Sequence, residues 1–274
     1  MKNNNISIVI PCRDDMKILG LLSTIDVDFA EIVIVFNGST NEFIEEVKNS
    51  FINYKNKISC YVLPKSNLAL ALEYGTIKSK NDLILYMDSD CRFKKGAIMQ
   101  FLSTADLYNP NQAVFKGTVV FEKGSNYIER IIATSREYHT AEVLTAYKPP
   151  LLISKKIIKK IGGYVFNEKL IWREDADLDN RIRKNNIEII PVNKGIIYHH
   201  KISLKTDLRS TFRYGIGLAI ANSMKIKLTE VPRSTLSAFK SKGLIVALYM
   251  LFRNRIYNAG YLFARIKILF GYYV

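Results

Sequence analysis

Two carboxylates that follow an apolar run are the residues of this chain best suited to chemistry. Residues 82–87 read DLILYM, and Asp88 and Asp90 follow them, two positions apart. A strand that ends in this way brings two hard oxygen ligands to the rim of a sheet, where a divalent cation and the phosphates that it neutralises can sit. The pair predicts such a site, with a turn that only caps a helix as the structural alternative.

A second acidic group lies in the segment WREDADLDNR at residues 172–181. Glu174 and Asp175 open a predicted helix, where the helix dipole favours carboxylates. Leu178 and Ile182 lie four positions apart and are predicted to face the core. One of the two acids at the helix start can therefore face a cleft.

The other acids of this segment have a structural interpretation. Asp177 and Arg181 are four positions apart and can form an ion pair on the solvated face of the helix. We prefer this interpretation for Asp177 and Asp179. For Glu174 and Asp175, a helix start without catalytic function remains the alternative.

The chain has three histidines, and two of them end a predicted short strand. Residues 196–198 read IIY, and His199 and His200 follow, whereas His139 lies alone. A neutral imidazole at a strand end near carboxylates can serve as a third metal ligand. Two surface histidines are the alternative.

The first half of the chain alternates strand and helix patterns that would position these residues. Strands are predicted at 6–10, 32–36, 58–63 and 83–87, and helices at 16–25, 41–52, 68–78 and 95–107. This order predicts an α/β fold with a mostly parallel sheet and helices on both faces. Ligands of such sheets bind at the carboxyl ends of the strands, where the polar residues of this chain gather.

Composition indicates an ordinary globular protein of one large or two small domains. Of the 274 residues, 48% are hydrophobic and 24% are charged, which is enough apolar material for a proper core. Cys12, Cys60 and Cys91 are odd in number and lack a C-x-x-C spacing, so we expect neither a disulfide framework nor a zinc cluster. These cysteines are typical of a reduced, cytosolic compartment. Residues 1–5 lead into a strand without a signal-peptide h-region, so we expect no export.

The net charge of +15 is concentrated near the C-terminus. Residues 201–274 hold thirteen Lys or Arg and two acids, which is +11 of the total. The apolar stretches 243–252 and 256–274 are interrupted by basic residues and fall short of the ~20 apolar residues that a spanning helix needs. This pattern favours helices that lie in an anionic membrane surface, with a helix packed on the body and a solvated basic face as the alternative. Nucleic-acid binding is disfavoured because no binding motif is present.

Seven short motifs together resemble family 2 glycosyltransferases of the GT-A fold over residues 6 to about 220. They are SIVIP at 7–11, VFNGST at 35–40, DSD at 88–90, GGY at 162–164, EDADL at 174–178 with Arg181, YHH at 198–200 and RYGIG at 213–217. The resemblance implies an inverting transfer of a sugar from a nucleotide diphosphate sugar, with Mn²⁺ or Mg²⁺ as cofactor. It implies that Asp90 binds the metal directly, and that Asp88 lies nearer the ribose or a metal-bound water. His199 is then the third ligand, with His200 in reserve.

The resemblance also implies roles at the acceptor side. Asp175 is the expected general base, because the acceptor hydroxyl must lose a proton as it attacks the anomeric carbon. Glu174 would orient this base or the acceptor, and Trp172 would offer an apolar face for a sugar ring. A simple core position is the alternative for Trp172.

Three residues fall at the family's nucleotide-binding positions: Pro11, Asp14 and Asn37, of which Asn37 would bind the base. Family members usually carry acids where Phe36 and Asn41 stand here. A uridine diphosphate sugar is the expected donor, and these departures leave other nucleotides open.

The expected organisation has a nucleotide-sugar-binding half at 1–110, an acceptor-binding half at 111–204 and a basic, apolar helical segment at 205–274. The expected acceptor is a glycan, a lipid-linked or a protein hydroxyl in surface-glycan assembly, at the inner face of the membrane. Two alternatives stay open: a non-catalytic scaffold that binds membrane or nucleic acid, and a nucleotidyltransferase. The latter is disfavoured because residues 11–15 read PCRDD and not a Gly-rich basic phosphate loop.

Overall fold

The first strands are continuous apolar runs that are buried along their whole length. In β1 (Ile6–Cys12) and β2 (Glu31–Asn37) every residue is buried, which is typical of parallel strands covered on both faces. β1 pairs in parallel with β2 and β4 (Leu83–Tyr86), and β2 pairs in parallel with β3 (Lys57–Leu63). These pairings confirm the parallel sheet that the sequence predicts.

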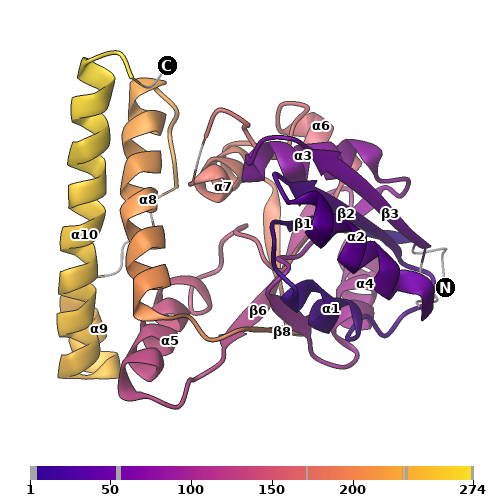
Figure 1. Ribbon diagram of the computed structural model, residues 1–274, viewed down its shortest axis with the longest axis horizontal. Helices are drawn as coiled ribbons and strands as arrows, with labels where there is room; N and C mark the ends of the chain where they lie inside the picture. Colours follow the sequence, from indigo (N-terminus) through magenta and orange to yellow (C-terminus); the bar gives the residue numbers. More distant parts are fainter. Residues whose placement is uncertain (1–4, 54–56, 171, 230, 232–233, 273–274) are drawn as a thin grey trace.

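This computed structural model describes residues 5–53, 57–170, 172–229, 231 and 234–272, and shows one sheet that continues beyond these four strands (Figure 1). Residues 1–4, on which the expectation about export depends, lie outside the described part. The sheet order is β3-β2-β1-β4-β7-β6-β8-β5. The additional strands are β5 (Cys91–Phe93), β6 (Ala113–Phe121), β7 (Leu151–Ser154) and β8 (Glu188–His199). β6 and β8 are parallel, whereas β7 and β5 pair antiparallel with their neighbours.

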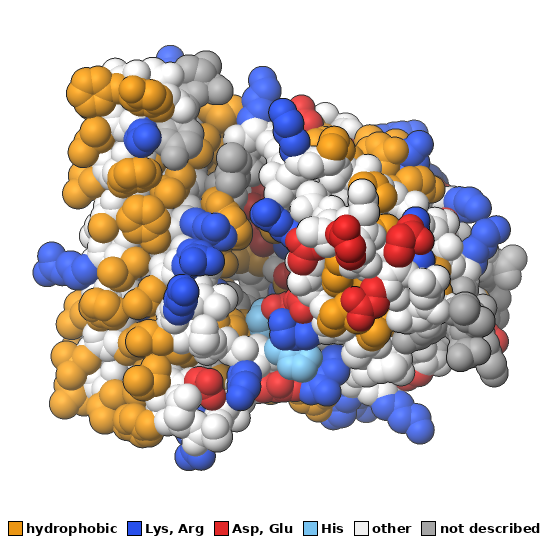
Figure 2. Space-filling view, viewed as in Figure 1, with side chains coloured by type: hydrophobic (Ala, Val, Ile, Leu, Met, Phe, Trp, Pro, Cys, Tyr) orange, Lys and Arg blue, Asp and Glu red, His pale blue; other side chains and the backbone are white. Residues whose placement is uncertain are grey.

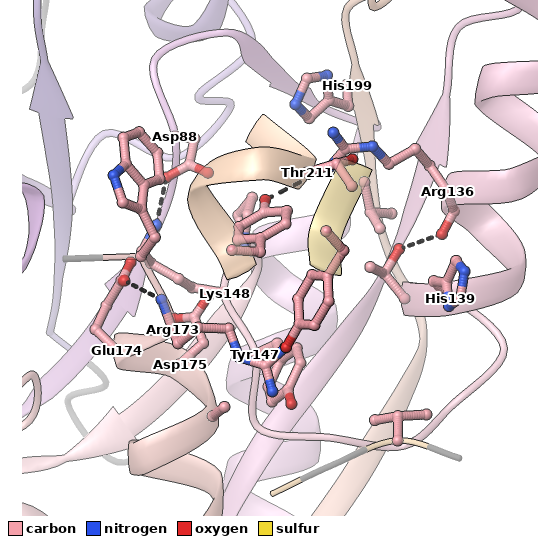
Figure 3. Close-up of a pocket in the computed structure, with 18 of the residues that line it drawn as sticks. Asp88, Arg136, His139, Tyr147, Lys148, Arg173, Glu174, Asp175, His199 and Thr211 are labelled. Carbon is pink, nitrogen blue, oxygen red and sulfur yellow. Dashed lines mark hydrogen bonds and ion pairs between the residues drawn. The ribbon is translucent and has the colours of Figure 1, made fainter. Parts of the chain in front are cut away.

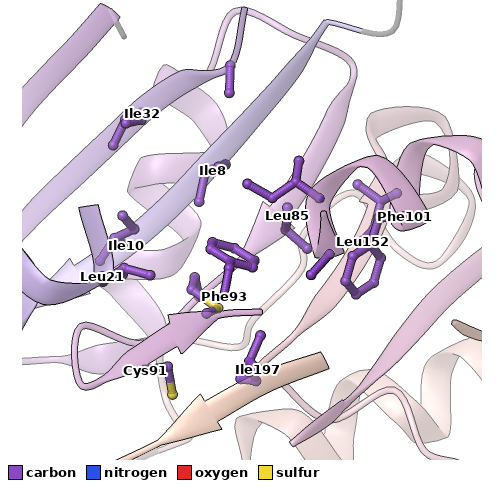
Figure 4. Close-up of a cluster of buried hydrophobic side chains, with 14 of the residues drawn as sticks. Ile8, Ile10, Leu21, Ile32, Leu85, Cys91, Phe93, Phe101, Leu152 and Ile197 are labelled. Atoms are coloured by element: carbon purple, nitrogen blue, oxygen red, sulfur yellow. The ribbon is translucent and has the colours of Figure 1, made fainter. Parts of the chain in front are cut away.

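Helices cover both faces of the sheet and create two hydrophobic cores. The helices of the body are α1 (Lys17–Leu22), α2 (Asn41–Asn49), the short 3-10 helix η1 (Ser50–Asn53), α3 (Leu68–Lys78), α4 (Ala97–Tyr108), α5 (Tyr127–Thr140), α6 (Lys155–Lys160) and α7 (Glu174–Lys184). α1, α2 and α4 pack on one face, where Ile8, Ile10 and Phe101 belong to the core (Figure 4). α3, α6 and α7 pack on the other face, which receives Val9. Alternate residues of β1 thus enter opposite cores.

The C-terminal segment forms a helical layer beside the body. It consists of α8 (Leu204–Ser223), α9 (Thr235–Lys242) and α10 (Leu244–Leu269), and α8 and α10 run side by side (Figure 1). Two glycines let their backbones touch: a Cβ on Gly215 would lie 2.0 Å from the carbonyl oxygen of Tyr257, and one on Gly260 would lie 2.0 Å from that of Phe212. Within the described residues, none of the helices has the length and hydropathy needed to cross a bilayer.

A buried ionic network attaches this layer to the body. Asp207 of α8 is fully buried and accepts from Arg136 Nε of α5 at 2.5 Å. Its other oxygen lies 2.9 Å from Arg253 Nε and accepts from the Tyr249 hydroxyl at 2.6 Å, both on α10. Burial opposes ionisation of Asp207, but the two guanidinium groups outweigh it and lower its pKa. One carboxylate therefore holds three helices together.

Candidate active site

The sheet brings the acidic pair and a histidine together. β5 pairs antiparallel with β8 so that Cys91 lies opposite His199. This register places Asp90, which precedes β5, against the end of β8, and the His200 N–H donates to the Asp90 carbonyl oxygen at 3.1 Å. His199 Nε2 then lies 3.5 Å from Asp90 Oδ2.

A hydrogen bond selects the tautomer of the neutral His199 ring. Its Nδ1 lies 2.7 Å from the His200 carbonyl oxygen, which can only accept, so Nδ1 carries the proton and Nε2 of the neutral ring has a free lone pair. The lone pair and the Asp90 carboxylate face each other as two acceptors, which a cation or a proton can bridge. His200, the reserve ligand, turns its Nδ1 to Glu122 Oε2 at 3.3 Å instead. The geometry thus favours His199 as the metal ligand.

The electrostatics around Asp90 also suit a cation. Burial raises the pKa of Asp90 above its ordinary value, and nearby Asp88 and Asp15 add to this rise. Cys91 Sγ lies close enough to join Asp90 and His199 as a ligand. However, burial raises the pKa of the Cys91 thiol well above its usual value, so it stays protonated and donates to Asp90 Oδ1 at 3.7 Å. The carboxylate of Asp90 is therefore the donor that fits Mn²⁺ or Mg²⁺ here, and the imidazole of His199 as a nitrogen donor makes the pair fit Mn²⁺ better than Mg²⁺.

The second acidic pair begins α7 after a strained turn. Trp172 and Arg173 both have positive φ, 63° and 110°, which non-glycine residues rarely adopt. Glu174 Oε2 accepts the Arg173 N–H at 3.0 Å, and this hydrogen bond stabilises the turn. Asp175 Oδ1 is buried without a hydrogen-bond partner among the described residues. Burial raises the pKa of Asp175 to about 8.

Two buried lysines lie between the acidic pairs. Lys148 Nζ is 3.1 Å from Asp88 Oδ1, and its side chain is only 4% exposed. Burial alone would lower the pKa of Lys148, but the nearby carboxylates raise it; these are Asp88, Asp175 and Glu174. Lys116 of β6 donates to the carbonyl oxygens of Tyr147 at 2.5 Å and Pro149 at 2.9 Å, and so holds the segment that carries Lys148. Burial lowers the pKa of Lys116 to about 8.

One pocket of about 550 Å³ brings both acidic motifs and both lysines together (Figure 3), whereas Asp90 lies behind His199 and does not line it. Five of the predicted site residues contribute to its wall: Asp88, Trp172, Glu174, Asp175 and His199. The opposite wall comes from α5, α8 and α10, through residues that include Arg136, Thr211, Arg253 and Tyr257. The guanidinium of Arg213 on α8 lies 4.6 Å from the centre of the Trp172 ring and covers one of its faces. The pocket therefore lies between the body and the C-terminal helices.

The sequence profile described as "Glycosyl transferase family 2" matches residues 7–174, which is more than half of the chain. The chain belongs to this family. Membership and the fold support a glycosyltransferase that uses a nucleotide sugar. No curated protein matches the chain.

Solved structures of GT-A glycosyltransferases share its fold. A mannosyltransferase, PcManGT from Pyrobaculum calidifontis, solved with GDP-Man and Mn²⁺, has a TM-score of 0.62 at 12% identity, over 97% of this chain and 87% of that one. TarS from S. aureus, residues 1–349 with UDP-GlcNAc, has a TM-score of 0.56 at 14% identity, over 97% and 92%. A longer TarS structure has a TM-score of 0.57 at 16% identity over 77% of this chain, which spans only 39% of its length.

The residues at the family's nucleotide-binding positions lie at the carboxyl ends of β1 and β2. Asp14 Oδ1 accepts the Thr40 N–H at 2.9 Å and so joins the two strand ends. Asn37 is 6% exposed, and its Oδ1 accepts the Asn67 N–H at 2.7 Å. Pro11 is buried at the same edge. None of these three lines the pocket of the described residues, and their nucleotide contacts stay predictions.

The structure corrects the interpretation of the remaining α7 acids. The Asp177–Arg181 ion pair forms at 2.9 Å, but Asp177 is 4% exposed and Asp179 is fully buried, so this face is not solvated. Asp179 Oδ1 accepts the Ala146 N–H at 2.6 Å. It thereby helps to position the loop before Lys148. An acid on a solvated helix face would not have this role.

Sequence reasoning did not find the two lysines of the pocket or the two arginines of its opposite wall, Arg136 and Arg253. Lys116 had a usable signal, because a lysine within the apolar run AVFKG of a strand must find a buried partner. Lys148, Arg136 and Arg253 had none, because they lie in a loop and in helices whose packing no local pattern predicts.

Proposed function

We propose that this protein is an inverting glycosyltransferase that moves a sugar from a nucleotide diphosphate sugar to an acceptor hydroxyl by metal-assisted single displacement. The observation that carries the proposal is the pocket that joins Asp88, Asp175 and His199, with Asp90 against His199. Separate motifs, far apart in the chain, would supply a metal site and a base to one cavity. This is what a single displacement between donor and acceptor requires.

Asp175 acts as the general base in this proposal. Its unpartnered oxygen can accept the proton of the acceptor hydroxyl, and a carboxylate whose pKa is raised by burial is a stronger base than an ordinary one. Lys148 favours the ionised form of Asp175, and its bond to Asp88 links the two acidic motifs. Glu174 stabilises the strained turn that orients Asp175.

Asp90 and His199 would hold the metal ion, with Asp88 beside it. When bound, Mn²⁺ or Mg²⁺ stabilises the negative charge that develops on the departing nucleoside diphosphate. The nucleotide would extend from there across the ends of β1 and β2, towards Asn37.

The ligands of the solved structures support the donor class that we propose, and the pocket supports the acceptor class. The solved relatives hold UDP-GlcNAc or GDP-Man, so we propose a hexosyl or N-acetylhexosaminyl donor of the uridine or guanosine type. Trp172 would contact the acceptor sugar with the ring face that Arg213 leaves free. The acceptor is a hydroxyl of a glycan, a lipid-linked sugar or a protein, in the assembly of surface glycans.

The decisive experiment incubates the purified protein and Mn²⁺ with a panel of UDP- and GDP-sugars and with glycan and lipid-linked acceptors. We expect one donor to yield a nucleoside diphosphate and a glycoside of inverted anomeric configuration by NMR. Release of pyrophosphate would instead identify a nucleotidyltransferase. Asp175→Asn should abolish transfer, while Asp28→Asn, at an exposed site, should not. Full activity of Asp175→Asn and Asp90→Ala would overturn the roles proposed for these two residues, and no transfer by the wild-type protein with any donor would overturn the proposal in favour of a scaffold.

A further inference from the structure

The side of α10 that faces away from the molecule is apolar. Its buried side, which includes Val246, Met250 and Gly260, packs on the rest of the protein. The residues that we call the outer face are 43% to 77% exposed: Leu244, Ile245, Leu248, Leu251, Phe252, Leu262, Phe263, Ile266 and Leu269. Figure 2 shows apolar side chains along the whole length of this layer. The outer face thus has two apolar stretches, 244–252 and 262–269, with the exposed Arg255 between them, and exposed apolar surface of this extent marks an interaction site.

The charge around the outer face has a single sign. Residues 231–274 contain seven Lys or Arg and no Asp or Glu. Arg255 and Arg265 are exposed on α10, and Lys240 is exposed on the neighbouring α9. Lys267 lies 5.7 Å from the centre of the Phe263 ring. Arg255 thus lies on the outer face between its two apolar stretches, four residues after Leu251, and the other basic side chains lie beside this face.

We propose that the outer face of α10 and the adjoining α9 bind in the plane of an anionic lipid surface. Apolar and aromatic residues flanked by Lys and Arg fit the boundary between acyl chains and anionic headgroups. A second copy of the chain would place the same positive charge opposite itself, which disfavours self-association through this face. Because the inner side of α10 packs on α8 along its length, the helix lies on the surface with the protein behind it.

The docked orientation brings the pocket close to the lipid. Arg253, Asn254 and Tyr257 of α10 line the pocket, and the outer face belongs to the same helix. The membrane binding does not depend on the proposed function, since it needs neither donor nor acceptor. The preference for a lipid-linked acceptor does rest on that function. The cytoplasmic leaflet is the matching surface because it carries the anionic lipids.

The test measures sedimentation of the full chain with vesicles of phosphatidylcholine and phosphatidylglycerol at low salt, without substrates. We expect binding that falls about tenfold or more in the triple variant Leu248→Ser, Phe252→Ser, Phe263→Ser, since each removes an inserted side chain. A matched control replaces Ile77 and Leu107, which are 68% and 76% exposed on the body, by serine and should bind as the wild type does. Equal binding of the outer-face variant and the control would overturn the proposal.

Two further measurements separate the lipid from other occupants. Arg255→Gln with Arg265→Gln, high salt, or vesicles of phosphatidylcholine alone should each weaken binding, because the headgroup attraction is electrostatic. A wild-type chain that ignores vesicles and sediments as a dimer, which the triple variant converts to a monomer, would instead assign the face to a second copy.

A site-specific reporter tests insertion directly. In a Trp172→Phe background, which removes the native tryptophan, Phe252→Trp should shift its emission to the blue on anionic vesicles and be quenched by brominated lipid. Tyr108→Trp, at an exposed body position of the same 48% exposure, should show neither change. The same response from both positions, or from neither, would contradict docking through α10.

Discussion

Asp175 has an oxygen that is buried and lacks a partner, beside a lysine that is also buried. A catalytic base must be ionised to accept a proton, and burial raises the pKa of this carboxyl to about 8. We therefore expect kcat/KM for transfer to rise as the pH increases towards and through this pKa, and to level off above it. The measurement is the pH profile of transfer at saturating Mn²⁺.

Lys148 should control the position of this profile. Lys148→Met removes a positive charge that favours ionised Asp175, so the pKa of Asp175 should rise and the profile should move to higher pH. Lys148→Arg keeps the positive charge, so its pH profile should stay close to that of the wild type. A profile that does not move in Lys148→Met would contradict the electrostatic role of this lysine.

The two adjacent histidines predict a difference in metal binding. His199→Ala removes the free Nε2 that faces Asp90, so Mn²⁺ affinity should fall about tenfold or more. His200→Ala, whose ring contacts Glu122, should change it little. The stabilisation of each variant by Mn²⁺ with UDP or GDP, read as a thermal shift, measures this difference. Equal loss in both variants would contradict the assignment.

At this scale, sequence reasoning found the residues that stand in ordered motifs. Asp88, Asp175 and His199 meet in one pocket as the resemblance implied. Lys148 was missed because its partners come from distant segments, and only the completed fold brings them within hydrogen-bond distance. Asp179 was placed on a solvated surface because helical spacing alone does not say which face a neighbouring loop covers.

Among the elements, the crossing of α8 and α10 depends on two glycines. Gly260→Ala would place a methyl group against the Phe212 backbone, which cannot move as a side chain can. We expect a loss of about 2 kcal/mol in the free energy of unfolding, as for other overpacked sites. Gly20→Ala in α1, where the nearest other atom is 3.9 Å away, should be neutral or stabilising. Thermal unfolding of both variants gives the comparison, and equal melting temperatures would contradict it.

The alternating strands and helices of the first half were predicted well, whereas β5 and β7 were not. α3 spans the predicted range 68–78, because its Leu and Ala residues and the Asn67 cap favour a helix there. β5 and β7 have three and four residues, too few to show a period, and were missed. They depend on pairing with β8 and β4, which are distant in the sequence.

At the scale of the whole molecule, Asp207 attaches the C-terminal layer to the body, because it joins α8 to α5 and α10. Asp207→Asn would leave Arg136 and Arg253 buried without their counter-charge, at a cost of about 3–5 kcal/mol in unfolding free energy. Because both arginines line the pocket, transfer activity should fall as well. Urea unfolding and transfer assays test both effects. Asp28→Asn is the control, and matching stability of the two variants would contradict the role of Asp207.

Trp172 is the single tryptophan of the chain and lies in the pocket wall under the guanidinium of Arg213. Tryptophan emission of the protein therefore comes from one position, with its ring in the body and the stacked cation on a C-terminal helix. Any movement between these two parts, or a sugar placed on the open ring face, changes the surroundings of that ring. Its emission can consequently report the binding of a sugar in the pocket without a label.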